Sequence, residues 1–421
     1  MKRLSRIAAT TALALTTTLS ALSVSAETLT FVSWQKDDPS FGAWWDEVIA
    51  EFEATHEGVD IEMTRVARNE YATSMFTMFA GAAPPDIVHL AAFEYQPFAA
   101  EGWLEPLDPY IAESGLDLTG WAGQATCEWD GNTSCLMLLY AGYVMAYNEA
   151  LLADAGVTTP PTDWESFLAA ARAATKDTDG DGVTDKFGVG MPTKGASSVM
   201  HGILNFVLGA GGDWTVDGKP TFDSEGTIEG LRRWKQLFDE GLTPRDLGTS
   251  DMRQLHIEGH IAMLLDGPWV RGVQKRAAED MLPNLKLAKT PFSPPVGGTS
   301  NVLAIPSDIS DERKNLVWDF IQIAASEKYQ QRFSAISSSP APRPGLDYSA
   351  EIAAEPYFEL IAEQANAAAA AGVDRLPRGL EIEFPEVGKI VLQEVQRMLI
   401  EDIDPAVTGK TIQERVLAIK K

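Results

Sequence analysis

The chain has 421 residues, of which 45% are apolar and 9% aromatic, and these fractions exclude a disordered protein. This length is too great for one ordinary hydrophobic core and favours two lobes. The chain carries 34 Lys and Arg residues against 60 Asp and Glu, a formal net charge of −26. Such an acidic surface repels phosphate backbones and anionic lipid, so nucleic-acid and membrane partners are not expected. It also favours a monomer.

Residues 1–26 have the pattern of an export signal. Lys2, Arg3 and Arg6 precede an apolar and Thr-rich run that ends in the small residues Val24-Ser25-Ala26. We therefore expect an N-terminal signal peptide that is cleaved after Ala26. The mature chain then has 31 basic and 60 acidic residues, a net charge of −29.

Strand and helix patterns alternate after this leader. The sequence predicts strands at 29–32, 59–63 and 85–90, with helices at 41–52 and 71–80 between them. This alternation is typical of a parallel, doubly wound sheet, whose ligands lie beyond the carboxyl ends of the strands. The candidate ligand-binding residues at these strand ends are Trp34, Gln35, Asn69, Glu70, Phe93 and Glu94.

A second unit of alternating elements begins near residue 138. Its predicted helices are 164–175, 197–209, 225–240, 250–259, 311–325, 361–371 and 386–401, and its predicted strands are 187–190, 261–265 and 301–306. Thr162 to Glu165 has the sequence of a capping box, and Ser310 is the expected N-cap of 311–325.

The two cysteines, Cys127 and Cys135, flank the turn sequence Asp130-Gly131-Asn132. We expect a hairpin that brings the two sulfurs together, and in an oxidising compartment a disulfide. The alternative is two free or metal-binding thiols. It is weaker because no other thiolate or nearby His completes a metal site.

The stretch DTDGDGVTDKFG, residues 177–188, begins like a calcium-binding EF-hand loop. Its alternating carboxylates are Asp177, Asp179, Asp181 and Asp185, but Gly188 stands where a bidentate Glu would close the ligand shell. A structural calcium ion is therefore one hypothesis. The favoured alternative is a turn whose carboxylates accept backbone hydrogen bonds, with no cofactor required.

Several stretches together resemble one family. They are GAAPPDIVHL (81–90), the run 147–190 from YNEALL to FGVG, EGHIAMLLDGPW (258–269), and the turn 297–300 with the following 303–305. Over almost the whole mature chain, their order and spacing are similar to those of the extracellular solute-binding proteins of bacterial ABC sugar importers, the maltose-binding-protein-like group.

This resemblance implies an α/β fold of two lobes, the periplasmic-binding-protein fold. Each lobe would be a mainly parallel sheet flanked by helices, and hinge segments would cross between them. The expected N-terminal lobe is 27–137 plus 300–347, and the expected C-terminal lobe is 138–299 plus 348–421.

The resemblance also implies further ligand contacts. The crossing segment 139–148 would place Tyr140 and Tyr143 beside a sugar, and Trp269, after Asp266, would lie under a sugar ring. The remaining candidates are Gly297, Gly298, Ser300 and Arg343. The prolines around Arg343 favour a role in fixing its loop over pairing with a ligand anion.

The expected function is therefore a periplasmic receptor that holds a sugar or oligosaccharide between its lobes and delivers it to the ABC permease. No catalytic residue is expected. A receptor for a polyol or an acidic sugar derivative is an alternative. Aromatic and amide residues at the strand ends favour a neutral ligand, whereas Arg68 or Arg343 in the cleft would favour an anion. A secreted carbohydrate hydrolase is another, with Glu70 and Glu94 as its carboxylate pair. A calcium-dependent adhesion module is a third.

Overall fold

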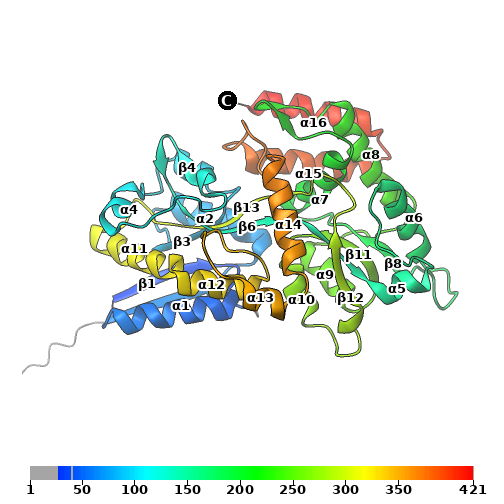
Figure 1. Ribbon diagram of the computed structural model, residues 1–421. Coiled ribbons are helices and arrows are strands. Elements are labelled where there is room, and N and C mark those ends of the chain that lie inside the picture. Colours follow the sequence, from blue (N-terminus) through cyan, green and yellow to red (C-terminus); the bar gives the residue numbers. More distant parts are fainter. Residues whose placement is uncertain (1–26, 39–40, 421) are drawn as a thin grey trace, which may run out of the picture.

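The computed structural model describes residues 27–38 and 41–420. The expected signal peptide lies outside the described residues, as do the side chains of Asn69 and Ser300. Two halves lie side by side, with helix α14 (Phe358–Ala370) between them (Figure 1). Within the described part of the chain, no helix is long and apolar enough to cross a membrane.

The first half is built on a five-stranded sheet with the order β2-β1-β3-β13-β6. Its strands are β1 (Glu27–Ser33), β2 (Val59–Arg65), β3 (Ile87–Ala91), β6 (Leu136–Gly142) and β13 (Gly297–Ala304). Strand β1 pairs in parallel with both β2 and β3, so the carboxyl ends of these three strands meet at one edge. Strand β13 is antiparallel to β3 and to β6.

Helices cover both faces of this first sheet. Helix α1 (Phe41–Thr55) buries Trp44, Trp45 and Phe52 at helical spacing, in one core with α11 (Asp311–Ala325) and α12 (Glu327–Ser337). The opposite face packs against α2 (Arg68–Ala80). The short helices α3 (Gln96–Ala100) and α4 (Asp108–Ser114) and the strands β4 (Glu128–Trp129) and β5 (Asn132–Thr133) complete this half.

The second half is built on a four-stranded sheet with the order β12-β7-β11-β8. Its strands are β7 (Val144–Asn148), β8 (Phe187–Gly190), β11 (Ile261–Asp266) and β12 (Leu285–Lys289). The prediction of a mainly parallel sheet needs correction here, because only β11 and β8 pair in parallel. Strand β7 follows β6 of the other sheet with no helix between them, and it is antiparallel to both of its neighbours, β11 and β12.

The helices of the second half are α5 (Glu149–Asp154), α6 (Trp164–Ala174), α7 (Ala196–Gly209), α8 (Glu225–Asp239), α9 (Thr249–Ile257), α10 (Val270–Gln274), α13 (Ser349–Ala354), α15 (Phe384–Ile400) and α16 (Pro405–Ile419). A small hairpin of β9 (Thr215–Val216) and β10 (Lys219–Pro220) lies beside α16. The largest apolar cluster fills the space between the sheet and the helices α5, α6, α7, α8, α15 and α16.

The chain crosses between the sheets at Tyr143, the single residue between β6 and β7. Helix α14 packs against this crossing, so closely that a Cβ on Gly142 would lie 2.3 Å from the carbonyl oxygen of Gln364. Only a glycine allows this approach. The crossing confirms the two-lobed architecture, whereas the residue boundaries of the lobes stay a prediction.

Most of the predicted strands and helices are confirmed, with ends shifted by a few residues. Ser310 caps α11 as expected, its side chain accepting a hydrogen bond from the Arg313 amide. The capping box of α6 lies one residue later than predicted. Asp163 is the N-cap, and it exchanges hydrogen bonds with Ser166 because the helix begins at Trp164.

The disulfide prediction is confirmed. Cys127 and Cys135 are bonded across the β4–β5 hairpin, and neither is exposed. Asp130 and Gly131 have φ values of 48° and 78°, which the tight turn of this hairpin requires.

Replacing both cysteines by serine should lower the free energy of unfolding by about 2–3 kcal/mol, because a short loop is no longer closed in the unfolded chain. Chemical denaturation followed by circular dichroism measures the difference. Dithiothreitol should destabilise the wild-type protein and leave the double variant unchanged. Equal sensitivity of the two proteins would contradict a stabilising disulfide.

Candidate functional site

A cavity of about 900 Å³ lies between the two halves and is called the cleft below. From the first half, its lining comes from the carboxyl ends of β1, β2 and β3, as expected for parallel strands. From the second half it comes from α7, α9, the turn after β11 and the start of α15, together with Arg375.

Aromatic rings form much of the cleft wall. Trp34 is stacked on His89 with ring centroids 4.1 Å apart, and Phe93 meets the edge of His201 at 4.9 Å. Trp269 faces Tyr143 edge-on at 6.2 Å. Trp34 and Trp269 are each partly buried, and each packs against apolar clusters of both halves. The rings therefore lie at the junction of the halves, where a ligand can contact both.

The turn after β11 fixes Trp269. Its indole Nε1 donates to Asp266 Oδ1 over 2.9 Å. Its ring lies directly over Gly267, where a Cβ would stand 2.2 Å from the ring carbons. Asp266 also accepts two hydrogen bonds from Arg253, at 2.6 and 2.9 Å. Any side chain at position 267 would displace the ring, so this glycine is a requirement of the site.

The guanidinium groups of Arg68 and Arg375 lie close to these rings. Arg68 donates to Glu94 Oε1 over 2.8 Å, and its guanidinium lies 4.9 Å from the centroid of the Trp34 ring. Arg375 lies 4.9 Å from Phe93 and 5.6 Å from Trp269. A guanidinium stacked on an aromatic face is held in one orientation, with its N–H donors in the plane of the group.

The histidines of this region are neutral. Burial, with Arg68 nearby, lowers the pKa of His89 to about 3. Burial and the charge of Arg375 hold the pKa of His201 well below its usual range. His89 Nδ1 lies 2.9 Å from Ser33 Oγ, so the ring beneath Trp34 is fixed.

Glu94 Oε2 and His201 Nε2 are buried polar atoms of the cleft lining for which the described residues supply no hydrogen-bond partner. A buried polar atom left without a partner costs free energy, and such atoms are rare in folded proteins. At a cavity wall, they indicate positions that a ligand's polar groups occupy.

The sequence was compared with known proteins. The family model described as "Bacterial extracellular solute-binding protein" matches residues 36–331, more than half of the chain. The chain belongs to this family.

Several proteins of known name or structure are similar to this solute-binding protein. The maltotriose-binding protein of Pyrococcus abyssi is 23% identical over 274 residues, covering 62% of this chain and 55% of that protein. The GacH receptor of Streptomyces glaucescens, studied unliganded and with acarbose, superposes with a TM-score of 0.79 at 21% identity, covering 94% of this chain and 100% of that one. An ABC transporter solute-binding protein of Thermotoga lettingae bound to α-D-tagatose has the same TM-score and coverage at 22% identity.

The cleft brings together half of the residues predicted to bind ligand. They are Trp34, Gln35, Phe93, Glu94, Tyr143, Asp266 and Trp269. Gln35 Oε1 already accepts a hydrogen bond from Trp45 Nε1 over 3.0 Å, so Gln35 braces the wall.

Five predicted residues lie outside the cleft lining: Glu70, Tyr140, Gly297, Gly298 and Arg343. Glu70 is exposed on the first turn of α2. Gly298 packs against Asp374, and Arg343 donates to the carbonyl of Ala325 over 3.1 Å, consistent with the loop role favoured for it. The predictions for the side chains of Asn69 and Ser300 fall outside what the structure describes.

Among the cleft residues that sequence reasoning missed are His201, Arg253 and Arg375. His201 and Arg253 lie on the helices α7 and α9, and Arg375 lies in the loop after α14. No motif surrounds any of them, and only the tertiary structure brings them to the strand ends.

The acidic loop lies apart from the cleft. Oxygens of Asp177, Asp179 and Asp185 lie within 4.8 Å of one another. Asp177 accepts hydrogen bonds from the amides of Gly180 and Gly182, which lower its pKa. The carboxylate of Asp181 accepts from the amide of Val183 over 2.7 Å. Carboxylates that accept backbone hydrogen bonds are what the turn hypothesis expects, and calcium binding stays a prediction.

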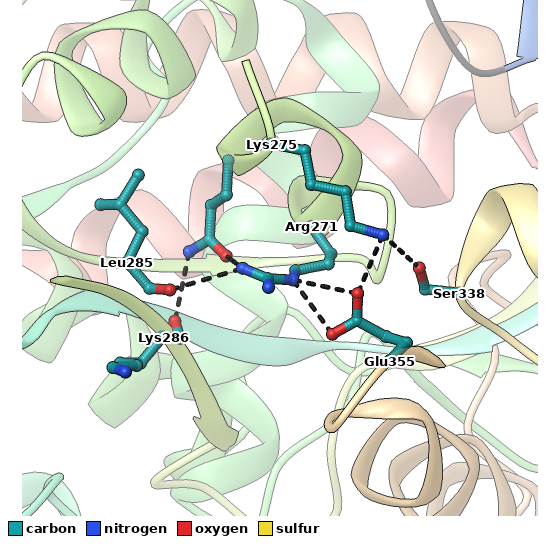
Figure 2. Close-up of polar contacts among 7 residues, drawn as sticks. Arg271, Lys275, Leu285, Lys286, Ser338 and Glu355 are labelled. Atoms are coloured by element: carbon teal, nitrogen blue, oxygen red, sulfur yellow. Dashed lines mark hydrogen bonds and ion pairs between the residues drawn. The ribbon is translucent and has the colours of Figure 1, made fainter. Parts of the chain in front are cut away.

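An ion-pair cluster around the buried Glu355 holds the helix that follows Trp269. Glu355 lies between Arg271 and Lys275 of this region (Figure 2), with Arg271 Nε 3.1 Å from its Oε1 and Lys275 Nζ 2.9 Å from its Oε2. Lys275 also lies 3.5 Å from the hydroxyl of Ser338, which ends helix α12 of the first half. Helix α10 is thus tied to Glu355 through Arg271 near its start and Lys275 at its end.

Replacing His89 by glutamine should flatten the pH dependence of stability. The folded pKa of His89, about 3, lies below the ordinary 6.5. Between these values the unfolded chain takes up a proton that the folded chain does not, so stability falls as pH falls. The loss approaches about 1.4 kcal/mol per pH unit for this residue and is absent from the variant. Urea unfolding from neutral pH down to about pH 4 measures both slopes. Parallel curves for the two proteins would exclude a neutral, buried His89.

Proposed function

We propose that this solute-binding protein is the sugar receptor of an ABC importer and works in the periplasm after export. It binds a sugar or oligosaccharide in the cleft and passes it to the membrane permease. The observation that carries the proposal is that one cavity wall combines aromatic rings with buried polar atoms that lack a hydrogen-bond partner. The rings are those of Trp34, Phe93 and Trp269, and the polar atoms are Glu94 Oε2 and His201 Nε2.

The chemistry of sugars fits this wall. A sugar ring has apolar C–H faces that pack on aromatic rings, and hydroxyl groups around its rim that both donate and accept hydrogen bonds. Glu94 Oε2 accepts from a hydroxyl, and His201 Nε2 bonds to a second one. The acarbose, α-D-tagatose and maltotriose named for three similar proteins support this class of ligand.

The proposed mechanism is closure without chemistry. The halves are joined where β6 continues into β7 through Tyr143 and where the chain returns from β12 to β13, and a small rotation at these crossings opens or closes the cleft. A ligand that contacts both halves stabilises the closed state, because its contacts are complete only in that state. The permease then distinguishes the closed receptor from the open one.

A carbohydrate hydrolase is the other candidate, and the cleft gives it less support. Such an enzyme needs two carboxyl groups on either side of one glycosidic bond. Glu70, the expected partner of Glu94, does not line the cleft. The buried carboxylates that do, Glu94 and Asp266, are each held by an arginine.

A thermal-shift screen of the mature protein against mono- and oligosaccharides tests the proposal, since a tight ligand raises the melting temperature by mass action. Calorimetry should then give one ligand per chain, and mass spectrometry should recover the ligand unchanged after long incubation. Conversion of the saccharide would support the hydrolase. A screen without any stabilising saccharide would contradict the receptor.

Replacing Trp269 by alanine should weaken binding of the saccharide found in this screen by about tenfold or more, because the ring face is lost. Replacing Trp129 by alanine is the matched control, because this tryptophan lies in the β4–β5 hairpin and does not line the cleft. Calorimetry of both variants measures the effect. Unchanged affinity in the Trp269 variant would remove its ring from the site.

A further inference from the structure

One aromatic ring of the cleft crosses from the first half of the molecule into the second. Phe93 lies in the turn after β3, where the amide of Glu94 donates to the carbonyl of Ala91 over 2.8 Å. The ring of Phe93 is only 4% exposed, and it belongs to the large apolar cluster of the second half. A ring that one half supplies and the other half buries has to leave its pocket when the two halves separate.

Two rings of the second half form the pocket for Phe93. His201 on α7 and Phe384 at the start of α15 each meet it edge-to-face, with ring centroids 4.9 and 5.8 Å away. These two rings are themselves stacked, 6.3 Å apart. Their helices pack so closely that a Cβ on Gly388 would lie 3.2 Å from the Cβ of Ala196. The packing of α7 on α15 therefore holds the pocket in place within the second half.

The residues that follow Phe93 are fixed in the first half. Glu94 accepts a hydrogen bond from Arg68 over 2.8 Å. The hydroxyl of Tyr95 donates to the carbonyl oxygen of Thr126 over 2.5 Å. The backbone of this turn is thus held by the first half, while the ring of Phe93 is held by the second. A contact of this kind links the two halves directly, without a ligand between them.

The ring of Phe93 has little surface left for a ligand. The guanidinium groups of Arg375 and Arg68 lie over it, 4.9 and 5.8 Å from its centroid. A sugar packs its C–H face on a ring face that is open to the cleft. Trp34 and Trp269 are only partly buried and offer such faces, whereas Phe93 is covered. Its effect on binding therefore comes through the second half.

We propose that Phe93 is a positioning residue whose ring, docked against His201 and Phe384, raises the fraction of closed molecules before a ligand binds. The inference rests on the proposed receptor function and adds a device that regulates its closure. Opening of the cleft exposes these rings to water, which is unfavourable in proportion to the apolar area exposed, and breaks their edge-to-face contacts. A ligand that selects the closed state binds more tightly when that state is already populated.

Small-angle X-ray scattering of the ligand-free mature protein tests the inference. In Phe93→Ala, the ratio of closed to open molecules should fall by about tenfold or more, and the radius of gyration should exceed that of the wild type. Phe384→Ala should have a similar effect from the other side of the contact. The combined variant should expand no further than Phe93→Ala alone, because both substitutions remove the same interaction. Circular dichroism verifies the fold of each variant.

A milder variant and a matched control complete the design. Phe93→Leu keeps an apolar side chain in the pocket and loses the aromatic edge, so its radius of gyration should lie between those of the wild type and Phe93→Ala. This variant carries the test if the alanine variants do not fold. Phe76→Ala is the control and should leave the radius unchanged. The Phe76 ring packs on Phe98 and Trp103 of the same half, with centroids 4.3 and 5.8 Å away, and does not line the cleft.

Each outcome has a distinct meaning. A folded Phe93→Ala or Phe93→Leu protein with the wild-type radius of gyration overturns the inference and leaves the receptor function intact. Additive expansion in the combined variant overturns the assignment of the contact to Phe384. Failure of the saccharide screen contradicts the receptor function, but it does not affect a difference measured between ligand-free proteins.

Discussion

The passage of β6 into β7 through one residue is the constraint on which the rest of the structure depends. Because a single extended segment supplies a strand to each sheet, the two halves face each other across the cleft. The close approach of α14 to Gly142 leaves no space for a side chain at this position. The loops after β1, β3 and β11 then meet without any loop having to be long.

The cleft formed in this way combines aromatic rings with charged groups. Arg68 lies over the ring of Trp34 and pairs with Glu94, and Arg253 pairs with Asp266 beside Trp269. Electrostatic interactions are stronger in such surroundings than in bulk water. A few hydrogen bonds in this setting can therefore select a ligand that has many competitors of similar size.

Sequence reasoning placed Trp34, Phe93 and Glu94 correctly at the cleft because strand alternation fixes where the ends of parallel strands meet. It misplaced Glu70 because α2 begins at Arg68, directly after β2. On a helix, residues two positions apart point in different directions, so Arg68 lines the cleft while Glu70 faces solvent.

Elements with a less distinctive pattern were missed. Helix α12 is largely polar, and its apolar stripe is limited to Tyr329, Phe333 and Ile336. The start of α16 had a visible signal in Asp404-Pro405, a capping residue followed by proline. The antiparallel direction of β7 depends on which sheet the strand joins, and this cannot be predicted from the residues of the strand itself. The same holds for Arg375, whose neighbours in the cleft come from distant parts of the chain.

Small-angle X-ray scattering of the mature protein, with and without a saturating saccharide, tests the central claim most directly. The account predicts a smaller radius of gyration in the bound state, because two halves joined at β6–β7 close on the ligand, and a return to the original value once the ligand is dialysed away. Identical scattering curves at full occupancy would contradict a receptor that signals by closing.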